Sequence, residues 1–310
     1  MSTIIITGGA GLIGMAITKA LVAKGHEVII LTRNPEQQKT SLNHVSFATW
    51  DITKQQVDPS VIARAQFIIH LAGAGIADKR WTSKRKNEIL ESRVKGSELL
   101  VKSLKEVGNN VQAVISASAI GHYGPDNPAS DSEFSETDPH YEDFLGQTCK
   151  KWEDSISPVQ QLNKRLVILR TGIVLSNEGG ALREFKKPLN FGLATILGDG
   201  RQVISWIHID DLVRLYIAAM ENETLNGVYN AVTSQPATNK EFVLTLAKEL
   251  RGRFFIPVYV PAFILKWVLG EMSIEVLKSA TVSNKKIRDA GFSFLYPTIH
   301  AAISALKSND

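Results

Sequence analysis

A glycine-rich turn near the N-terminus has the spacing of a phosphate-binding loop. The run Thr7-Gly8-Gly9-Ala10-Gly11-Leu12-Ile13-Gly14 separates an apolar stretch typical of a strand from one typical of a helix. Gly8 permits the tight turn, Gly11 lets the backbone approach a pyrophosphate, and Gly14 lets the helix pack closely on the strand. The N–H groups that open the helix, beginning with Leu12 and Ile13, would then face the anion. The alternative is an ordinary turn between a strand and a helix.

The end of the second predicted strand indicates which dinucleotide would bind. The chain reads Leu31-Thr32-Arg33-Asn34 there, about 20 residues beyond the glycines, where an NAD site usually has Asp or Glu to accept from the ribose hydroxyls. Arg33 instead offers a guanidinium that can pair with a 2′-phosphate or stack on adenine. We therefore expect NADP(H) rather than NAD(H), with Thr32 and Arg33 at the ribose. The alternative is a solvated surface Arg.

Further residues on the predicted cofactor side follow three other strands. Asp51 comes after the third strand and would bind the adenine amino group or cap a turn, and both interpretations stay open. Leu71, Ala72 and Gly73 follow the fourth strand, where small residues allow close backbone approach to a ribose. Ser116 closes the apolar run of the fifth strand, and we place it on the same side.

The chain resembles a known family through a series of short motifs that run in order along nearly its whole length. Besides the glycine turn, they are His70-Leu71-Ala72-Gly73, Ser92-Arg93-Val94, Ser116-Ala117-Ser118-Ala119, Arg170-Thr171-Gly172, residues 198–211, Gly227-Val228-Tyr229-Asn230, Leu269-Gly270-Glu271 and Gly291-Phe292-Ser293-Phe294. Together they resemble the extended short-chain dehydrogenase/reductase family. The closest match is its atypical "epimerase family protein" branch, within the NAD(P)-dependent epimerase/dehydratase superfamily. The resemblance implies a substrate lobe built from the later residues, with a site between that lobe and the sheet.

The proton-transfer residues of that family are not all present. Typical members use Tyr-x-x-x-Lys and a nearby Ser: the Tyr acts as acid or base, the Lys lowers its pKa, and the Ser polarises the carbonyl. None of the six tyrosines here is followed by Lys four residues later, and the aligned helix has Leu145 and Cys149 in the two positions. Ser118 lies where the family's Ser or Thr lies, and Tyr123 would replace the missing acid. The alternative for Tyr123 is packing under the smaller lobe.

Candidate substrate contacts come from several parts of the chain. The expected wall of the site consists of Trp81, Arg93, Arg170, Trp206 and His208. Arg93 would bind an anionic substrate or a backbone carbonyl, since a buried Arg needs one of them. Trp206 and His208 serve equally well as core supports. Nucleotide-sugar epimerases commonly have Arg at the position of Ile204, and this Arg binds the diphosphate of the substrate. Ile204 cannot form that charge-assisted hydrogen bond.

The elements that must position these residues alternate in type along the first half of the chain. Apolar runs predict strands at residues 4–7, 28–32, 45–48, 67–71, 113–116 and 166–170, and helical spacing appears at 12–24, 84–107 and 144–156. This order predicts an α/β fold, a Rossmann-type doubly wound parallel sheet. Residues 192–200 read as a glycine-rich loop, and Asp210-Asp211 is expected to cap a helix.

The remaining residues form a smaller, mostly helical C-terminal substrate lobe. We assign residues 1–171 and about 203–231 to the dinucleotide-binding domain, and about 172–202 and 232–310 to the lobe. The apolar segment 261–269 is the core of that lobe, a lid, a dimer face or a helix on a membrane surface.

Composition limits the classes of function. The formal charge of +4 over 310 residues gives no basic footprint for nucleic acid, and no run is long enough to span a membrane. Cys149 is the single cysteine and no signal peptide is visible, so we expect a cytoplasmic protein, a monomer or homodimer, with no metal site. The partner would be a small molecule.

These observations favour an NADP(H)-dependent oxidoreductase that acts on a small carbonyl or alcohol substrate. In that function Ser118 polarises the carbonyl, and Tyr123 or water supplies the proton. A non-catalytic module that senses NADPH or regulates a partner fits the same residues. A nucleotide-sugar epimerase ranks below both, because Ile204 cannot replace an Arg.

Overall fold

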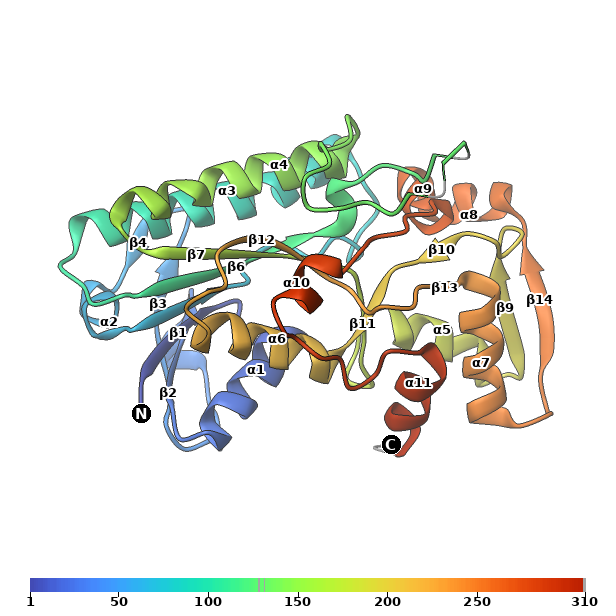
Figure 1. Ribbon diagram of the computed structural model, residues 1–310, viewed down its shortest axis with the longest axis horizontal. Helices are drawn as coiled ribbons and strands as arrows, with labels where there is room; N and C mark the ends of the chain where they lie inside the picture. Colours follow the sequence, from blue (N-terminus) through green and yellow to red (C-terminus); the bar gives the residue numbers. More distant parts are fainter. Residues whose placement is uncertain (128, 131, 309–310) are drawn as a thin grey trace.

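An eight-stranded sheet forms the centre of the computed structural model, which describes residues 1–127, 129–130 and 132–308. Its strands lie in the order β12-β7-β6-β5-β1-β2-β3-β4 (Figure 1). They are β1 (Thr3–Thr7), β2 (Glu27–Thr32), β3 (Val45–Asp51), β4 (Gln56–Val57), β5 (Phe67–His70), β6 (Ala113–Ala119), β7 (Arg165–Thr171) and β12 (Gly227–Ala231). All pair in parallel except β4, which is antiparallel to β3. The chain builds outward from β1 in both directions, so the doubly wound Rossmann-type sheet is confirmed.

Helices cover both faces of this sheet. α1 (Leu12–Ala23) and α6 (Ile209–Glu221) lie on one face, and α3 (Ser83–Glu106) and α4 (Phe144–Ile156) lie on the other, with the short α2 (Pro59–Arg64) (Figure 1). The strands are therefore apolar on both sides: in β1, Ile4 and Ile6 join the core under α1 and α6, while Ile5 joins the core under α3. Continuous apolar runs of this kind are expected of a sheet covered on two faces.

The smaller lobe packs beyond the carboxyl ends of the central strands. Its helices are α5 (Ala181–Leu189), α7 (Asn239–Arg251), α8 (Ala262–Leu269), α9 (Ser273–Leu277) and α11 (Ile299–Ser308). The short α10 (Lys285–Asp289) instead packs against β12, and its Ile287 belongs to the core of the central sheet. Three two-stranded sheets accompany the helices of the lobe: β8 (Ile173–Leu175) with β11 (Trp206–His208), β10 (Val203–Ile204) with β13 (Ala237–Thr238), and β9 (Leu193–Leu197) with β14 (Ile256–Val260). Leu182, Ile196, Phe242 and Ile303 belong to its core. In the described part of the chain, no helix has the length and apolar character that crossing a membrane requires.

Two local predictions were wrong in the second half of the chain. Residues 193–197 form strand β9 rather than a loop, because Ala194 and Ile196 bury their side chains and the strand pairs with β14, about 60 residues later. The helix at 209 is capped by His208, whose ring accepts a hydrogen bond from the Asp210 N–H. Asp211 is fully buried instead, and its carboxylate accepts from the backbone N–H groups of Leu295 and Tyr296.

The apolar segment 261–269 is not the core of the lobe. It contains the whole of α8, in which Leu265 is the one buried residue, while Phe263 and Trp267 are 72% and 81% exposed.

Candidate functional site

The glycine turn forms a tight cradle at the carboxyl end of β1. Gly8 has φ +72°, and the Gly11 N–H donates to the Gly8 carbonyl at 3.0 Å. A Cβ on Gly14 would lie 2.5 Å from the Gly8 oxygen, so only glycine permits this packing of α1 on the turn. The first turn of α1 has no side-chain cap and no acidic residue. A helix start of this kind suits an anion, and the residues present therefore fit a bound pyrophosphate.

The end of β2 lies beside this cradle. Leu31 is in register with Thr7, so Thr32 and Arg33 are level with the first two glycines of the turn. Arg33 is exposed there. The Asp51 carboxylate accepts from the N–H groups of Thr53 and Lys54 at 2.9 and 3.0 Å, which is the turn-capping role. These hydrogen bonds, with the charges of Lys54 and Arg33, hold the pKa of Asp51 below its usual value.

A row of polar side chains crosses the sheet at the same level. Thr7, His70 and Ser116 are in register on β1, β5 and β6, and all three are buried. His70 joins Thr7 Oγ1 through Nδ1 at 2.8 Å and Ser97 Oγ through Nε2 at 3.3 Å. Burial lowers the pKa of His70 to about 4. The Thr7 hydroxyl also accepts from the N–H groups of Leu71 and Ala72, which fixes the start of the loop that ends at the exposed Gly73.

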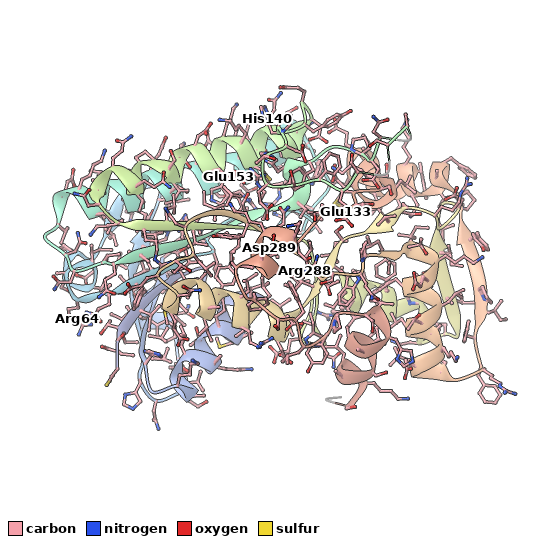
Figure 2. The ribbon with its side chains drawn as sticks, in the orientation of Figure 1. Arg64, Glu133, His140, Glu153, Arg288 and Asp289 are labelled. Carbon is pink, nitrogen blue, oxygen red and sulfur yellow. The ribbon has the colours of Figure 1, made fainter. Side chains whose placement is uncertain are left out.

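A second row, further along the strands, forms a buried ionic network. Ser118, Arg170 and Asn230 are in register on β6, β7 and β12. Glu153, on α4, accepts from Ser118 Oγ at 2.6 Å and from Arg170 Nε and Nη2 at 2.9 and 2.8 Å. Figure 2 shows Glu153 between α4 and the sheet. This charge-assisted, two-pronged pair holds the pKa of Arg170 above its usual value despite the opposing effect of burial.

Tyr123 belongs to the same network. It is fully buried, its hydroxyl donates to Asn230 Oδ1 at 2.7 Å and accepts from Arg170 Nη1 at 2.9 Å, and its ring stacks on Phe134. Burial raises its pKa to about 12, although Arg170 opposes the shift. This arrangement matches packing under the smaller lobe, the alternative to an acid role.

His122, beside Tyr123, lies 4.0 Å from Glu153 through Nδ1. Its Nε2 faces the Asp138 carbonyl at 3.3 Å and therefore carries the ring proton, since a carbonyl only accepts. Burial, followed by the charge of Arg170, lowers the pKa of His122 to about 4. The ring is therefore neutral at pH 7, and its Nδ1 is a buried acceptor without a hydrogen-bond partner among the described residues.

The first two turns of α4 present an apolar surface to the end of β6. A Cβ on Gly121 would lie 3.2 Å from the Leu145 side chain, and burial raises the pKa of Cys149, which lies against the Ala119 backbone, to about 12. Helix α4 therefore runs antiparallel to β6. Leu145, in its first turn, lies opposite residue 121, and Glu153, two turns further on, lies opposite Ser118. Glu153 is eight residues, or about 12 Å, along the helix from Leu145. Ser118 consequently faces the interior, well below the start of α4.

The other predicted substrate residues have partners inside the protein. Arg93 donates to the carbonyls of Ala74 and Ile89 through Nη1 at 3.0 and 2.9 Å, and its guanidinium lies over the Trp152 ring. Trp206 is fully buried and donates to the Gln235 carbonyl, while His208 caps α6. These contacts correspond to the structural alternatives to substrate binding: a backbone-carbonyl contact for Arg93, and core support for Trp206 and His208. Arg170 is in the network described above.

Trp81 differs from the others because it is half-buried at the carboxyl edge of the sheet. Its ring meets that of Phe144, the first residue of α4, at 5.0 Å between centroids and an interplanar angle of 72°. The indole N–H donates to the Ile76 carbonyl at 2.9 Å, which fixes the ring on the loop after β5.

Glu153 is the residue that the sequence prediction missed. It lies on the same helix face as Leu145, Cys149 and Ile156, all of which are buried. A single carboxylate on an apolar face needs a buried cationic or donor partner. That signal was present in the sequence, but it did not identify Arg170 as the partner.

Comparison with known proteins gives a consistent relationship over the whole chain. The NAD dependent epimerase/dehydratase family matches residues 4–144 and 181–231, and a domain of unknown function, DUF1731, matches residues 260–306. An epimerase family protein of Staphylococcus saprophyticus is 34% identical over 306 residues, which is 99% of each chain.

Two solved structures resemble this one at 30% sequence identity. A human epimerase family protein, whose crystal structure was determined with NADPH, aligns with a TM-score of 0.85 over 99% of each chain. A nucleoside-diphosphate sugar epimerase of Corynebacterium glutamicum aligns with a TM-score of 0.76 over 98% of this chain and 57% of its own.

Proposed function

The chain belongs to the NAD dependent epimerase/dehydratase family, and on that premise we propose that it binds NADP(H) and transfers a hydride to or from a small carbonyl or alcohol compound. The cradle at Gly8, Gly11 and Gly14 carries this proposal, because its glycines let the turn pack against α1 and the helix begins without a side-chain cap or an acidic residue. The NADPH in the human relative supports the choice of cofactor.

Each part of the cofactor has candidate residues. The backbone N–H groups of Leu12 and Ile13 would hold the pyrophosphate, and Arg33, exposed beside the cradle, would pair with the 2′-phosphate. The loop Leu71–Gly73 and Ser116 would border the nicotinamide half. When bound, the nicotinamide supplies or accepts the hydride, and the chain orients it and limits access of water.

The roles of Ser118 and Tyr123 in catalysis stay predictions. Both hydroxyls donate to protein acceptors, Ser118 to Glu153 and Tyr123 to Asn230. This geometry favours water over Tyr123 as the source of the proton.

Replacement of Arg33 tests the cofactor assignment. In Arg33→Ala we expect NADPH affinity to fall about 10- to 100-fold, the effect of losing a charge-assisted hydrogen bond, while NADH affinity changes less than about threefold. Fluorescence titration of NADPH and NADH measures both. Arg64→Ala is the matched control, since Arg64 is an exposed Arg that pairs with Glu27 at the opposite end of β2. An equal loss for both cofactors would refute the 2′-phosphate contact, and failure of the wild-type protein to bind either would refute the function.

A non-catalytic NADPH-binding module is the second candidate. It is favoured by the apolar residues Leu145 and Cys149 at the start of α4 and by the engaged hydroxyls of Ser118 and Tyr123. Assays of NADPH oxidation with a panel of aldehydes and ketones distinguish the two, with Ser118→Ala and Tyr123→Phe in parallel. Binding without turnover of any substrate in the panel would support the module.

A further inference from the structure

Helix α8 presents apolar side chains to solvent at the outer end of the smaller lobe (Figure 1). Leu265 is its one buried residue, whereas Phe263 and Trp267, one turn apart on the same side of the helix, are largely exposed. A helix of eight residues is not stable by itself in water, and packing of its apolar side normally holds such a helix in place. Most of that side faces outward here, so α8 has an apolar surface that its own lobe does not cover.

A groove of about 610 Å³ runs between α8 and α9 on this surface. Its walls are largely apolar and include Phe263 and Lys266 of α8, Glu271 of the following turn, and Ile274 and Leu277 of α9. Trp267 is not part of the lining, but it follows Phe263 by one turn and therefore stands beside the groove. We use the name α8 face for this groove together with the exposed side chains of residues 263, 266, 267, 271 and 274.

The α8 face carries one charge of each sign. Lys266 is exposed and has no ion-pair partner in the described part of the chain. Glu271, whose side chain is 53% exposed, pairs with Lys86 at 2.7 Å and keeps an accessible carboxylate. A cation, an anion and a projecting ring beside an apolar groove make this face complementary to a rotated copy of itself.

We propose that the α8 face is the contact of a homodimer whose two copies are related by a twofold axis. Such an axis brings a surface against its own duplicate, so each contact occurs twice. Trp267 of each copy enters the α8–α9 groove of the other, and Lys266 of each copy lies near Glu271 of the other. This inference goes beyond the proposed function and does not depend on it, because it concerns the smaller lobe alone.

The exposed area is what a stable dimer needs. A large apolar side chain contributes about 200 Å² when fully exposed, so Phe263, Trp267 and Ile274 together present roughly 450 Å² of apolar surface. A standard interface buries about 800 Å² per partner, of which somewhat more than half is apolar. The α8 face therefore offers about as much apolar area as one side of such an interface contains.

Two other roles of an exposed apolar helix fit these residues less well. A lid has to move, but the Arg80 guanidinium donates to the Trp267 carbonyl at 3.2 Å and Lys86 pairs with Glu271. These contacts fix the end of α8 and the turn after it to the loop that follows β5 and to α3. A helix on a membrane surface has a strongly basic polar side, whereas Lys266 is the single basic residue of α8.

Strand β14, which precedes α8, is not suited to join the copies by extending its sheet. It pairs on one edge only, with β9, and the Ile256 N–H donates to the Gly192 carbonyl on that edge. Because alternate residues of a strand direct their N–H groups to opposite edges, Pro257 lies at the open edge, where it has no N–H to donate. Proline at an open edge hinders pairing with a second strand, which leaves side-chain packing on the α8 face.

The mass of the wild-type protein in solution provides the first test. Interfaces of standard size have dissociation constants in the micromolar range or below, so light scattering after gel filtration at about 50 µM should give the mass of two chains. The mass of one chain at about 200 µM, well above that range, would overturn the proposal. Single chains that instead sediment with phosphatidylglycerol vesicles would identify a membrane as the occupant of the face and would overturn it as well.

A substitution at Trp267 tests which surface forms the dimer. Trp267→Glu removes the ring and places a carboxylate in the apolar groove of the other copy, so the dissociation constant of the dimer should rise at least about 100-fold. Phe254→Glu, at an aromatic residue 86% exposed on the same lobe but outside the face, is the matched control and should stay dimeric. A Trp267→Glu protein that dimerises as tightly as wild type would show that the copies meet elsewhere.

Charge reversal tests the twofold arrangement. Lys266→Glu places two carboxylates together at two symmetric positions and should weaken the dimer about three- to tenfold at about 50 mM NaCl, with a smaller effect at about 500 mM. Lys102→Glu, at an exposed residue of α3, is the control and should have no effect. Equal dissociation constants for Lys266→Glu and wild type would contradict the pairing of Lys266 with Glu271.

NADPH titration of the same variants separates this inference from the proposed function. The α8 face lies outside the glycine cradle, so Trp267→Glu should bind NADPH within about threefold of wild type. If that variant does not fold, the wild-type mass and Lys266→Glu still decide. A wild-type protein that binds NADPH as a single chain overturns the dimer alone, whereas a dimer that binds no cofactor overturns the proposed function and leaves the dimer standing.

Discussion

Glu153 and Arg170 show how the interior of this protein tolerates charge. The two side chains form two hydrogen bonds of 2.8 and 2.9 Å, and both residues are almost fully buried. Ser118, Tyr123 and Asn230 extend the pair, so strands β6, β7 and β12 and helix α4 share one network. Taking two charges out of water is costly, and a pair of this kind contributes little net stability but becomes very unfavourable when one partner is removed.

Glu153→Gln should therefore be strongly destabilising. The amide cannot neutralise Arg170, which would remain buried with its charge uncompensated, and we expect the free energy of unfolding to fall by about 3–5 kcal/mol. Urea denaturation followed by circular dichroism measures the loss. Glu142→Gln, whose side chain is 77% exposed beside His140, is the control, with an expected change below about 1 kcal/mol. Equal effects of the two substitutions would show that the network is dispensable.

At the scale of elements, the packing of α1 on β1 determines the geometry of the cofactor cradle. The helix approaches so closely that the Gly9 Cα would lie 2.6 Å from a Cβ on Gly14, and Gly11 at the N-cap leaves the first turn uncovered. The close packing and the open helix start therefore depend on the same few glycines.

Gly14→Ala tests this dependence. Its methyl group forces the turn and the helix apart, and overpacking of this kind costs about 1–3 kcal/mol, so we expect NADPH to bind at least about tenfold more weakly. Gly108→Ala is the matched control, because a Cβ there has no neighbour within 4 Å. NADPH titration and thermal unfolding of both variants provide the comparison. NADPH affinity unchanged by Gly14→Ala would mean that the cofactor binds elsewhere.

Two buried histidines bear on the stability of the whole molecule. His70 links β1 to α3, and His122 lies where the loop after β6 meets α4. Burial lowers the pKa of each to about 4, from an ordinary value of 6.5. Between these values the unfolded chain binds more protons than the folded chain, so stability falls as the pH drops through this window.

We expect the unfolding free energy of the wild-type protein to decline from pH 6.5 to pH 4, with up to about 3 kcal/mol of the decline due to His70. His70→Gln, which cannot titrate, should be less stable at pH 7 but should show a shallower decline. Denaturation midpoints at four pH values between 4 and 7.5 measure the slope. His300→Gln, at a histidine whose side chain is 72% exposed, should keep the wild-type slope. A His70→Gln slope identical to wild type would exclude this origin of the acid sensitivity.

The local elements were largely predictable because their signals lie between close neighbours in the chain. The glycine turn predicted the junction of β1 and α1, and the apolar spacing of residues 144–156 predicted the bounds of α4. Strand β9 was missed because its partner, β14, is far away in sequence and its own five residues lie among glycines.

The sequence by itself determined the doubly wound sheet and the position of the cradle, because hydrophobic periodicity and glycine sterics act over a few residues. Only the tertiary structure decided the use of the polar side chains. Strand register and one helix face bring Ser118, Glu153 and Arg170 together, and Tyr123 is enclosed by residues more than 100 positions away, such as Asn230. Burial and hydrogen bonding between distant segments depend on how those segments pack, and spacing along the chain does not encode that directly.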